Sequence, residues 1–482
     1  MFARIVLNIP SDTCFTYAVP EQFASRVTVG VRVLVPFGKR RITGYVVEVT
    51  GMGDREDIKD IIDVPDGDPL FSKRDLAFYR WTADYYMYPL GKTLKSILPG
   101  GINMESSRWL RMSGDRNAHE QIILSPGQRE IVETVSLHPG GITIKKLQRK
   151  VKRIGVYEDI RKLTARGIIT AEDRLGTPDV RKKTQNIISL TGKGDDRRPL
   201  TEKQRMIIRL LQDHGDLSLS SLNETIAHAT AAVRRLEKRE IVTVQPQEVF
   251  RNPGEVSFLG AHGKPEKLTD EQAAVLGKIK YGLSSRRYAP YLLHGVTGSG
   301  KTEVYFCAIE EVLQSGGSVL LLVPEIALTP QLLSRIQERF DRNETAILHS
   351  GITKGEKFDE WRRIMNGAAR IVIGVRSAVF APIRGLRLVI VDEEHDPSYK
   401  QDDRMPYNGR NLAIVKAKLN DAVVILGSAT PAIQTTFNAR ERDFTCLNLT
   451  RRVDDRPLPH VDVVDMKNER DEKGMASILS RP

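Results

Sequence analysis

A glycine-rich segment in the second half of the chain carries residue types that bind phosphate. Residues 291–302 read YLLHGVTGSGKT, a short apolar run followed by the spacing G-x-x-x-x-G-K-[ST]. Three glycines let the backbone approach phosphate oxygens closely, and the N–H groups of the loop and of the following helix then form an anion cradle. Lys301 is predicted to reach the β- and γ-phosphates, and the Thr302 hydroxyl to ligate Mg²⁺. The predicted nucleotide contacts in the loop are Gly295, Gly298, Ser299, Gly300, Lys301 and Thr302. The alternative is a glycine-rich turn that matches by chance.

A second segment ends an apolar run with adjacent acids. Residues 386–395 read LRLVIVDEEH, which is typical of a buried parallel strand whose carboxyl end bears carboxylates. Asp392 is predicted to hold Mg²⁺ through water, and Glu393 to polarise the attacking water as a general base. With Lys301 they are the predicted catalytic residues, whereas Glu394 and His395 are expected to couple the site to neighbouring motifs. The alternative is a solvated acidic loop.

Three further apolar runs indicate the element that positions these residues. Residues 318–331, 369–382 and 422–431 read SVLLLVPEIALTPQ, ARIVIGVRSAVFAP and AVVILGSATP. Each of the five runs ends in a loop, mostly followed by a helix-like segment, so the pattern predicts a parallel sheet with helices on both faces. The ligand loops all fall at the carboxyl ends of strands, where open α/β sheets bind their ligands.

Upstream, the chain repeats itself. Residues 124–135 and 200–211 are similar, as are residues 159–170 and 232–243. Each copy reads as three helices followed by a strand, which predicts a winged-helix region whose basic residues contact DNA phosphates. Helical spacers with solvated basic faces, or protein-docking modules, are the alternatives.

The first 106 residues contain four short β-type runs, ARIVLNI, FTYAVP, RVLVPFG and ITGYVVEVT, punctuated by turn residues. They predict a small β-rich domain. A helix-like span over residues 73–98 follows, and its periodic aromatics are more typical of packing than of a ligand platform.

The composition of the 482-residue chain favours a polyanionic partner, because 73 Lys and Arg outnumber 61 Asp and Glu. No apolar run approaches the roughly 18 residues of a membrane span, and the N-terminus lacks a signal-peptide pattern, so a cytoplasmic protein without membrane contact is expected. The three cysteines are scattered without metal-ligand spacing, and buried thiols are expected.

Taken together, GSGKT, PEIALTP, GVRSA, DEEH and GSATP resemble the first motor lobe of a superfamily 2 helicase. The longer runs GVTGSGKTEVY, DEEHDPSYKQDDRMPYNGRNLA and GSATPA are similar to the primosomal protein N′ family, the replication-restart helicases. The resemblance runs from residue 1 to the end and implies a multidomain α/β protein. Its implied parts are a β-rich 3′-end DNA-binding domain (1–106), a winged-helix region (120–250, with copies at 122–175 and 198–250), a RecA-like ATP-binding lobe (265–450) and the start of a second motor lobe (451–482).

In that family the N-terminal domain is a pocket for the 3′ end of a nascent DNA strand. The matching positions are Phe15, Thr16, Gly38 and Lys59. Phe15 is expected to stack on the terminal base and Lys59 to contact phosphate. Thr16 stands where the family commonly has Asp, and a hydroxyl accepts a hydrogen bond from the 3′-hydroxyl more weakly than a carboxylate does.

The motor lobe carries further expected DNA contacts, because the loop after the acids interleaves aromatic and cationic residues. The predicted contacts are Tyr399, Lys400, Arg404, Tyr407 and Arg410 in this loop, together with Arg376 in the earlier GVRSA motif. A polar loop that packs on the motor is the alternative. Gly409, Asn411 and Val375 stand where the family pattern has Ala, Asp and Thr.

Thr269 is a predicted helix N-cap just before the motor. A glutamine near this point reads the adenine in related helicases, so Gln272 is a candidate for that contact. A surface helix residue is the alternative reading.

The resemblance implies an ATP-dependent DNA helicase that recognises stalled or branched forks and initiates primosome assembly. ATP and Mg²⁺ are the implied cofactors, with zinc only beyond the end of this chain. Branched and single-stranded DNA, primosome proteins and single-stranded DNA-binding protein are the implied partners of an expected monomer. Because the chain stops where the family begins its second lobe, and loss of an arginine finger costs roughly 10³ to 10⁵ in rate, little turnover is expected. The alternative is a nucleotide-gated fork-binding scaffold without unwinding activity.

Overall fold

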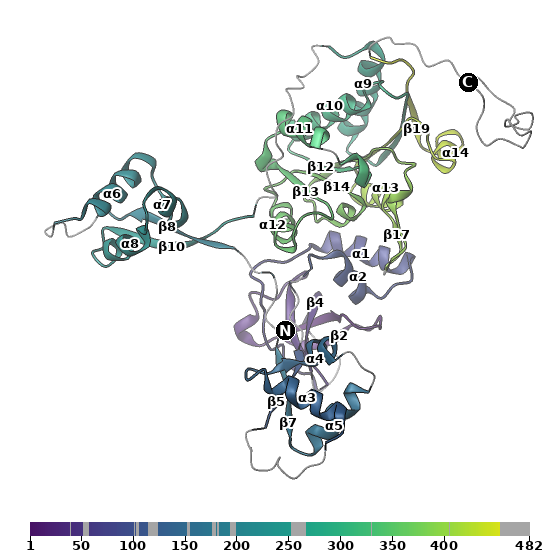
Figure 1. Ribbon diagram of the computed structural model, residues 1–482. Coiled ribbons are helices and arrows are strands. Elements are labelled where there is room, and N and C mark those ends of the chain that lie inside the picture. The colour runs from purple at the N-terminus through teal and green to yellow at the C-terminus, as the bar shows by residue number, and fades with distance from the viewer. Residues whose placement is uncertain are drawn as a thin grey trace, which may run out of the picture.

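The computed structural model describes most of the chain (Figure 1). Outside the described part lie residues 39, 52–56, 101, 103–105, 114–123, 152–154, 176–179, 181–182, 193–198, 252–266, 329, 404 and 454–482. The predicted fold class is confirmed, since a β-rich N-terminal unit, two winged-helix units and a parallel α/β sheet follow one another along the chain. The domain boundaries stay a prediction, and most of the predicted segment 451–482 falls outside the described residues.

The N-terminal unit is a four-stranded antiparallel sheet in the order β2-β1-β4-β3. Its strands are β1 (Phe2–Leu7), β2 (Phe15–Ala18), β3 (Arg32–Phe37) and β4 (Arg40–Thr50). Ala3, Ile5 and Leu7 alternate along β1 and are buried in the core of this unit, as the period of two in a strand requires. Two helices follow, α1 (Lys73–Tyr85) and α2 (Leu90–Ile97), and a capping box between Ser72 and Asp75 starts the first.

Both winged-helix units are built from a three-stranded sheet and three helices. The first contains β5 (Ser106–Met112), α3 (Pro126–Ser136), β6 (Ile142–Thr143), α4 (Ile144–Val151), α5 (Val156–Ala165) and β7 (Ile169–Leu175). The second contains β8 (Thr184–Leu190), α6 (Glu202–His214), β9 (Leu217–Ser218), α7 (Leu219–Thr225), α8 (Ala229–Glu237) and β10 (Val242–Glu248). Each has its own apolar core, and each begins with a strand that the helix-first pattern did not predict.

The motor lobe is a seven-stranded parallel sheet in the order β13-β14-β12-β15-β18-β11-β19. Its strands are β11 (Ala289–Gly295), β12 (Ser318–Leu322), β13 (Thr345–Leu348), β14 (Ile371–Gly374), β15 (Leu386–Val391), β18 (Val423–Ser428) and β19 (Thr445–Leu449). The helices are α9 (Asp270–Ser285), α10 (Lys301–Gln314), α11 (Pro330–Arg339), α12 (Lys354–Met365), α13 (Gly409–Leu419) and α14 (Ile433–Glu441). The five predicted strands are present, and β13 and β19 are additional. Strands β15, β18 and β11 are neighbours, so the loops that follow them meet at one edge of the sheet.

The helices α1 and α2 join the N-terminal unit to the motor lobe (Figure 1). The Tyr79 hydroxyl donates to the Phe380 carbonyl at 2.7 Å, and the Trp361 indole N–H donates to the Leu70 carbonyl at 2.8 Å. Both aromatic side chains are buried, so their polar ends need these acceptors. The two units therefore share one continuous core.

Among the described residues, no helix has the length and apolar character to cross a membrane. All three cysteines are free thiols. The expectation that they are buried is wrong, since Cys14 and Cys307 are half-buried and Cys446 is exposed.

Candidate nucleotide and DNA sites

The phosphate loop, residues 295–302, lies between β11 and α10. Gly298 and Gly300 adopt positive φ angles of 81° and 79°, which glycine adopts without strain. A Cβ atom on Gly300 would lie 2.2 Å from Nε2 of Gln272, so a larger residue there would displace the Gln272 side chain from the loop. Because α10 starts at Lys301, directly after Gly300, the positive end of its dipole faces the loop. The local conformation therefore matches a phosphate cradle.

The Ser299 side chain provides a further test of the fit to a nucleotide. The residue is 3 % exposed, and its hydroxyl oxygen has no hydrogen-bond partner among the described residues. A buried hydroxyl without a partner costs free energy that a ligand oxygen can offset. The loop thus offers both the backbone geometry and an unsatisfied polar group suited to a nucleotide phosphate.

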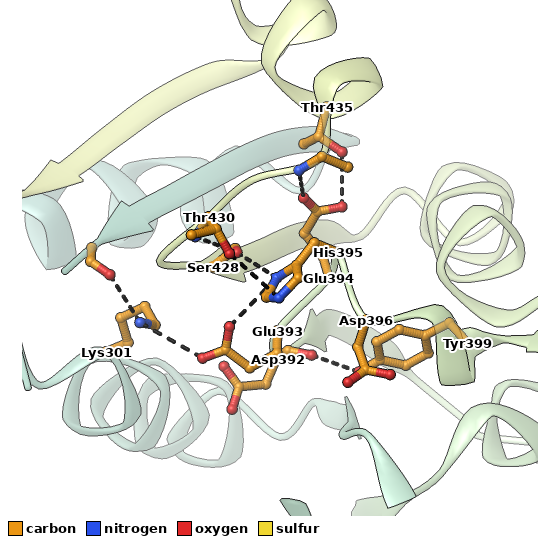
Figure 2. Close-up of polar contacts among 12 residues, drawn as sticks. Lys301, Asp392, Glu393, Glu394, His395, Asp396, Tyr399, Ser428, Thr430 and Thr435 are labelled. Atoms are coloured by element: carbon orange, nitrogen blue, oxygen red, sulfur yellow. Dashed lines mark hydrogen bonds and ion pairs between the residues drawn. The ribbon is translucent and has the colours of Figure 1, made fainter. Parts of the chain in front are cut away.

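The predicted catalytic side chains converge beside the phosphate loop (Figure 2). Lys301 donates to the Gly295 carbonyl at 2.9 Å, and its Nζ lies 3.9 Å from Oε1 of Glu393. Glu393 has a φ angle of 43°, a left-handed conformation that costs a non-glycine residue free energy. That conformation turns its carboxylate toward Lys301 and toward the His395 ring, which is 3.6 Å away.

Asp392 lies deeper than Glu393, at the end of β15. Its Oδ1 accepts a hydrogen bond from the Tyr305 hydroxyl at 3.0 Å. Burial, and next the charge of Glu393, raise the pKa of Asp392 above its ordinary value. The structure therefore places a partly desolvated carboxylate beside a second one, an arrangement that a divalent cation stabilises. The half-buried Thr302, the second residue of α10, is the other predicted Mg²⁺ ligand.

Glu394 and His395 contact the loop after β18. The buried Glu394 carboxylate accepts from the Ala432 N–H at 2.7 Å and from the Thr435 hydroxyl at 2.9 Å. His395 Nδ1 lies 2.8 Å from the Ser428 hydroxyl (Figure 2). These contacts link the acidic loop to the GSATP segment, and the coupling role predicted for both residues remains a proposal.

Gln272 is buried against the phosphate loop. Its side chain forms a capping box with Thr269 and donates to the Ser299 carbonyl at 3.0 Å. The same Ser/Thr-x-x-Gln pattern caps α3 and α6, where Gln128 and Gln204 are also buried. Gln272 is therefore not the surface helix residue of the alternative reading, and its contact with adenine stays a prediction.

Two of the aromatic residues predicted to stack on DNA lie in the core, and this corrects the prediction. Tyr399 is 1 % exposed, and its hydroxyl donates to the Asp392 carbonyl at 2.6 Å. Tyr407 is 4 % exposed and packs edge-on against Phe380. Neither ring offers a face to a base, because stacking requires an accessible π-surface.

The cationic residues predicted to contact DNA divide into internal and exposed groups. Arg410 pairs with the buried Glu394 at 2.9 Å, and Arg376 donates to the carbonyls of Ser398 and Lys400 at 2.9 and 2.7 Å. Both therefore hold the segment after the acids in place, and the DNA contacts predicted for Arg376 and Arg410 stay predictions. Lys400 is exposed and stays a candidate phosphate contact, whereas Arg404 lies outside the described residues.

The predicted N-terminal DNA residues meet in one pocket of about 330 Å³. Phe15, Thr16, Gly38 and Lys59 all line it. The Phe15 ring packs edge-on against Phe37, with 5.3 Å between the ring centroids. Phe37 therefore helps to fix the orientation of Phe15 in the pocket. The structure thus brings the four residues together, and their contact with a DNA 3′ end remains a proposal.

Several residues of the nucleotide site carried no sequence prediction of their role. Tyr305 binds Asp392, and Thr435 and Ser428 bind the acidic loop. Tyr305 lies four residues after Lys301 on α10, so helical periodicity was a usable signal for its placement on the same face. The other two depend on the neighbouring order of β15 and β18, which the sequence pattern does not specify.

Comparisons with known proteins agree with this geometry. Residues 4–99 match the PriA family of 3′ DNA-binding domains (3′BD), and residues 269–438 match the DEAD/DEAH box helicase family. The replication restart protein PriA of Bacillus subtilis (strain 168) is 31% identical over 97% of this chain and 58% of its own length. PriA of Synechocystis sp. is 36% identical over 100% of this chain and 58% of its own length. Among solved structures, RecG bound to a three-way DNA junction covers 39% of this chain, and 24% of RecG is matched, at 24% identity and a TM-score of 0.30, too low to support an argument.

The fold and the site together define a helicase-type ATPase lobe of the DEAD/DEAH class, attached to a 3′ DNA-binding domain. Along its whole length, the chain is similar to the PriA replication restart proteins. It spans 58% of the length of those two relatives.

Proposed function

We propose that this chain provides the nucleotide-binding and fork-binding parts of an ATP-dependent DNA helicase that recognises stalled or branched replication forks and initiates primosome assembly. The observation that carries the proposal is the position of Glu393, whose carboxylate lies 3.9 Å from the Lys301 ammonium at the mouth of the phosphate loop. The ammonium group proposed to bind the phosphates therefore lies next to the carboxylate proposed to act as the base for water.

In the proposed reaction, the phosphate loop orients the triphosphate and Lys301 binds its outer phosphates. Thr302 and Asp392 are the residues that would hold Mg²⁺, which when bound neutralises charge on the phosphate oxygens. Glu393 orients and polarises the attacking water at its carboxylate oxygens. His395, within 3.6 Å of Glu393, connects this base to Ser428 and so to the loop after β18.

For DNA, we propose that the N-terminal pocket receives a 3′ end, with the Phe15 ring against the terminal base and Lys59 on phosphate. We further propose branched and single-stranded DNA, primosome proteins and single-stranded DNA-binding protein as the partners of a cytoplasmic monomer. The match to a 3′ DNA-binding domain supports the DNA partners. Thr16 in the pocket lacks a carboxylate, so we propose weak discrimination of the 3′-hydroxyl.

The test is ATP hydrolysis by the 482-residue chain with and without forked DNA, beside Lys301→Ala as a blank. We expect slow turnover that rises with the fork and disappears in the variant. Fork binding that responds to ATP, without any hydrolysis, would favour the alternative, a nucleotide-gated scaffold.

A further inference from the structure

A short segment that follows β19, which we call the strap (residues 450–453), lies against the phosphate loop. The Val453 N–H donates to the Gly298 carbonyl at 3.0 Å. Its Cγ2 would lie 3.1 Å from a Cβ atom on Gly300. The strap therefore touches the two loop glycines whose positive φ angles form the cradle.

The first turn of α9 fixes the other end of the strap. Glu271 accepts from the Thr450 N–H at 2.8 Å and from the Thr450 hydroxyl at 2.5 Å. The hydrogen bond from that hydroxyl is also the main cause of the lowered pKa of Glu271. The adjacent Gln272 holds the Ser299 carbonyl, so consecutive residues of α9 hold the strap and the phosphate loop.

Arg452 lies in the middle of the strap, over the phosphate loop. Its Cγ and Cδ would be 3.8 and 3.9 Å from a Cβ atom on Gly298. Its Nε is shielded from solvent and has no hydrogen-bond partner in the described part of the chain. A shielded guanidinium N–H without an acceptor is costly, which indicates that an acceptor belongs there.

Among the described residues, the carboxylates of Glu271 and Glu393 already have other partners. Glu271 binds the strap backbone and the Thr450 hydroxyl, and Glu393 faces Lys301 and His395. Ser299, on the same loop, adds a second buried polar atom without a partner among the described residues. An anion with several oxygens, bound at the phosphate loop, would supply acceptors for both groups.

We propose that Arg452 binds the polyphosphate chain of a nucleotide in the phosphate loop, as a second cation beside Lys301. This inference rests on the proposed function, because it assumes that the loop binds nucleotide. It assigns to the strap a direct part in nucleotide binding, since its backbone is fixed at Glu271 and at Gly298 and its central side chain is left for the ligand.

The test is the affinity for Mg²⁺-ADP and for Mg²⁺-tripolyphosphate, measured by calorimetry on the 482-residue chain and its variants. Arg452→Ala is expected to weaken both ligands by about tenfold or more, as for loss of a charged hydrogen bond. Arg451→Ala, which removes the same charge from the neighbouring exposed position, is the matched control and is expected to stay within about twofold. Arg452→Lys should recover part of the loss. Thermal unfolding without ligand checks that each variant is folded.

Unchanged binding in Arg452→Ala, or an equal loss in Arg451→Ala, would overturn the inference. If Arg452→Ala weakened the binding of ADP but not of tripolyphosphate, Arg452 would contact the base or the ribose, and the inference would also be overturned. If the wild-type chain bound neither ligand, the proposed function itself would fail. If Lys301→Ala lost binding while Arg452→Ala retained it, only the role of Arg452 would fail.

Discussion

At the scale of single residues, Asp392 shows the conflict between stability and function in the nucleotide site. Its pKa is raised by burial and by the charge of Glu393, so ionisation of Asp392 costs the folded state free energy. The folded state holds this proton more tightly than the unfolded chain. The contribution of Asp392 to stability therefore falls as pH rises from the unfolded pKa through the raised folded one.

Asp392→Asn should therefore raise the thermal unfolding temperature at neutral pH, because the amide still accepts from Tyr305 but carries no charge. A gain of about 1 kcal/mol corresponds to roughly 2 to 4 °C. The same variant should lose the Mg²⁺ dependence of nucleotide binding, measured by titration at several Mg²⁺ concentrations. A lower unfolding temperature with Mg²⁺ dependence intact would contradict this account of Asp392.

Arg410 and Lys400 give a contrasting pair. Arg410→Ala leaves the buried Glu394 without its cationic partner, and breaking such a pair is expected to cost about 3 kcal/mol of unfolding free energy. Lys400→Ala removes an exposed charge and should weaken single-stranded DNA binding without lowering stability. Chemical denaturation and fluorescence anisotropy measure the two effects. If the effects were exchanged between the variants, our assignment of internal and external cations would be wrong.

Residue types and spacing were enough to predict the phosphate loop and the acids, because that chemistry is local in the sequence. They were not enough for Tyr399 and Tyr407. An aromatic residue interleaved with cations suits DNA stacking and core packing equally well, and only the tertiary structure shows that both rings are buried. The sequence likewise contains no sign that Arg410 reaches Glu394 on another loop.

At the scale of elements, the helix α13 contains a buried lysine, Lys416, on the side that packs near α1. The Lys416 ammonium donates to the carbonyls of Val379 and Ala381 at 2.7 and 2.6 Å and lies 5.2 Å from the centre of the Phe78 ring. Burial lowers the pKa of Lys416 to about 8, while the charge of Asp75 acts in the opposite direction. The unfolded chain thus binds this proton more tightly than the folded one.

The contribution of Lys416 to stability should therefore rise with pH from about 8 to its ordinary value of 10.5, by a few kcal/mol at most. Lys416→Met should remove that rise. The measurement is denaturant unfolding of both proteins across this pH range, compared as a difference so that tyrosine titrations cancel. Parallel pH profiles would mean that Lys416 is not charged and buried as described.

Long apolar runs predicted five strands of the motor sheet, but two short strands were not predicted. In β13 and β19 the run is only four or five residues, and β19 alternates with exposed positions. Both strands form by pairing with another strand of the sheet: β13 pairs with β14, and β19 pairs with β11. The first strands of the winged-helix units, β5 and β8, were also not predicted. Each pairs with a strand more than 50 residues later in the chain, and a local sequence pattern does not reveal such a pairing.

At the scale of the whole molecule, the shared core between α1 and the motor lobe places the DNA-end pocket and the nucleotide site on one body (Figure 1). Phe15→Ala should weaken binding of a fork with a free 3′ end by about tenfold or more, as expected for loss of one base stack. Tyr157→Ala, an exposed aromatic on α5, is the control and should have no effect on this preference. Anisotropy with free and blocked 3′ ends measures both. Equal affinity of wild type and Phe15→Ala for the free end would rule out the pocket as the binding site.

The phosphate loop and the acids that follow β15 are together proposed to form a Mg²⁺-nucleotide site. Equilibrium binding of ATP to the 482-residue chain, with and without Mg²⁺ and beside Lys301→Ala, tests it most directly. We expect Mg²⁺-dependent binding that Lys301→Ala weakens by at least about tenfold, because a charged contact to phosphate is lost. Absence of binding by the wild-type chain, or equal binding by the variant, would contradict it.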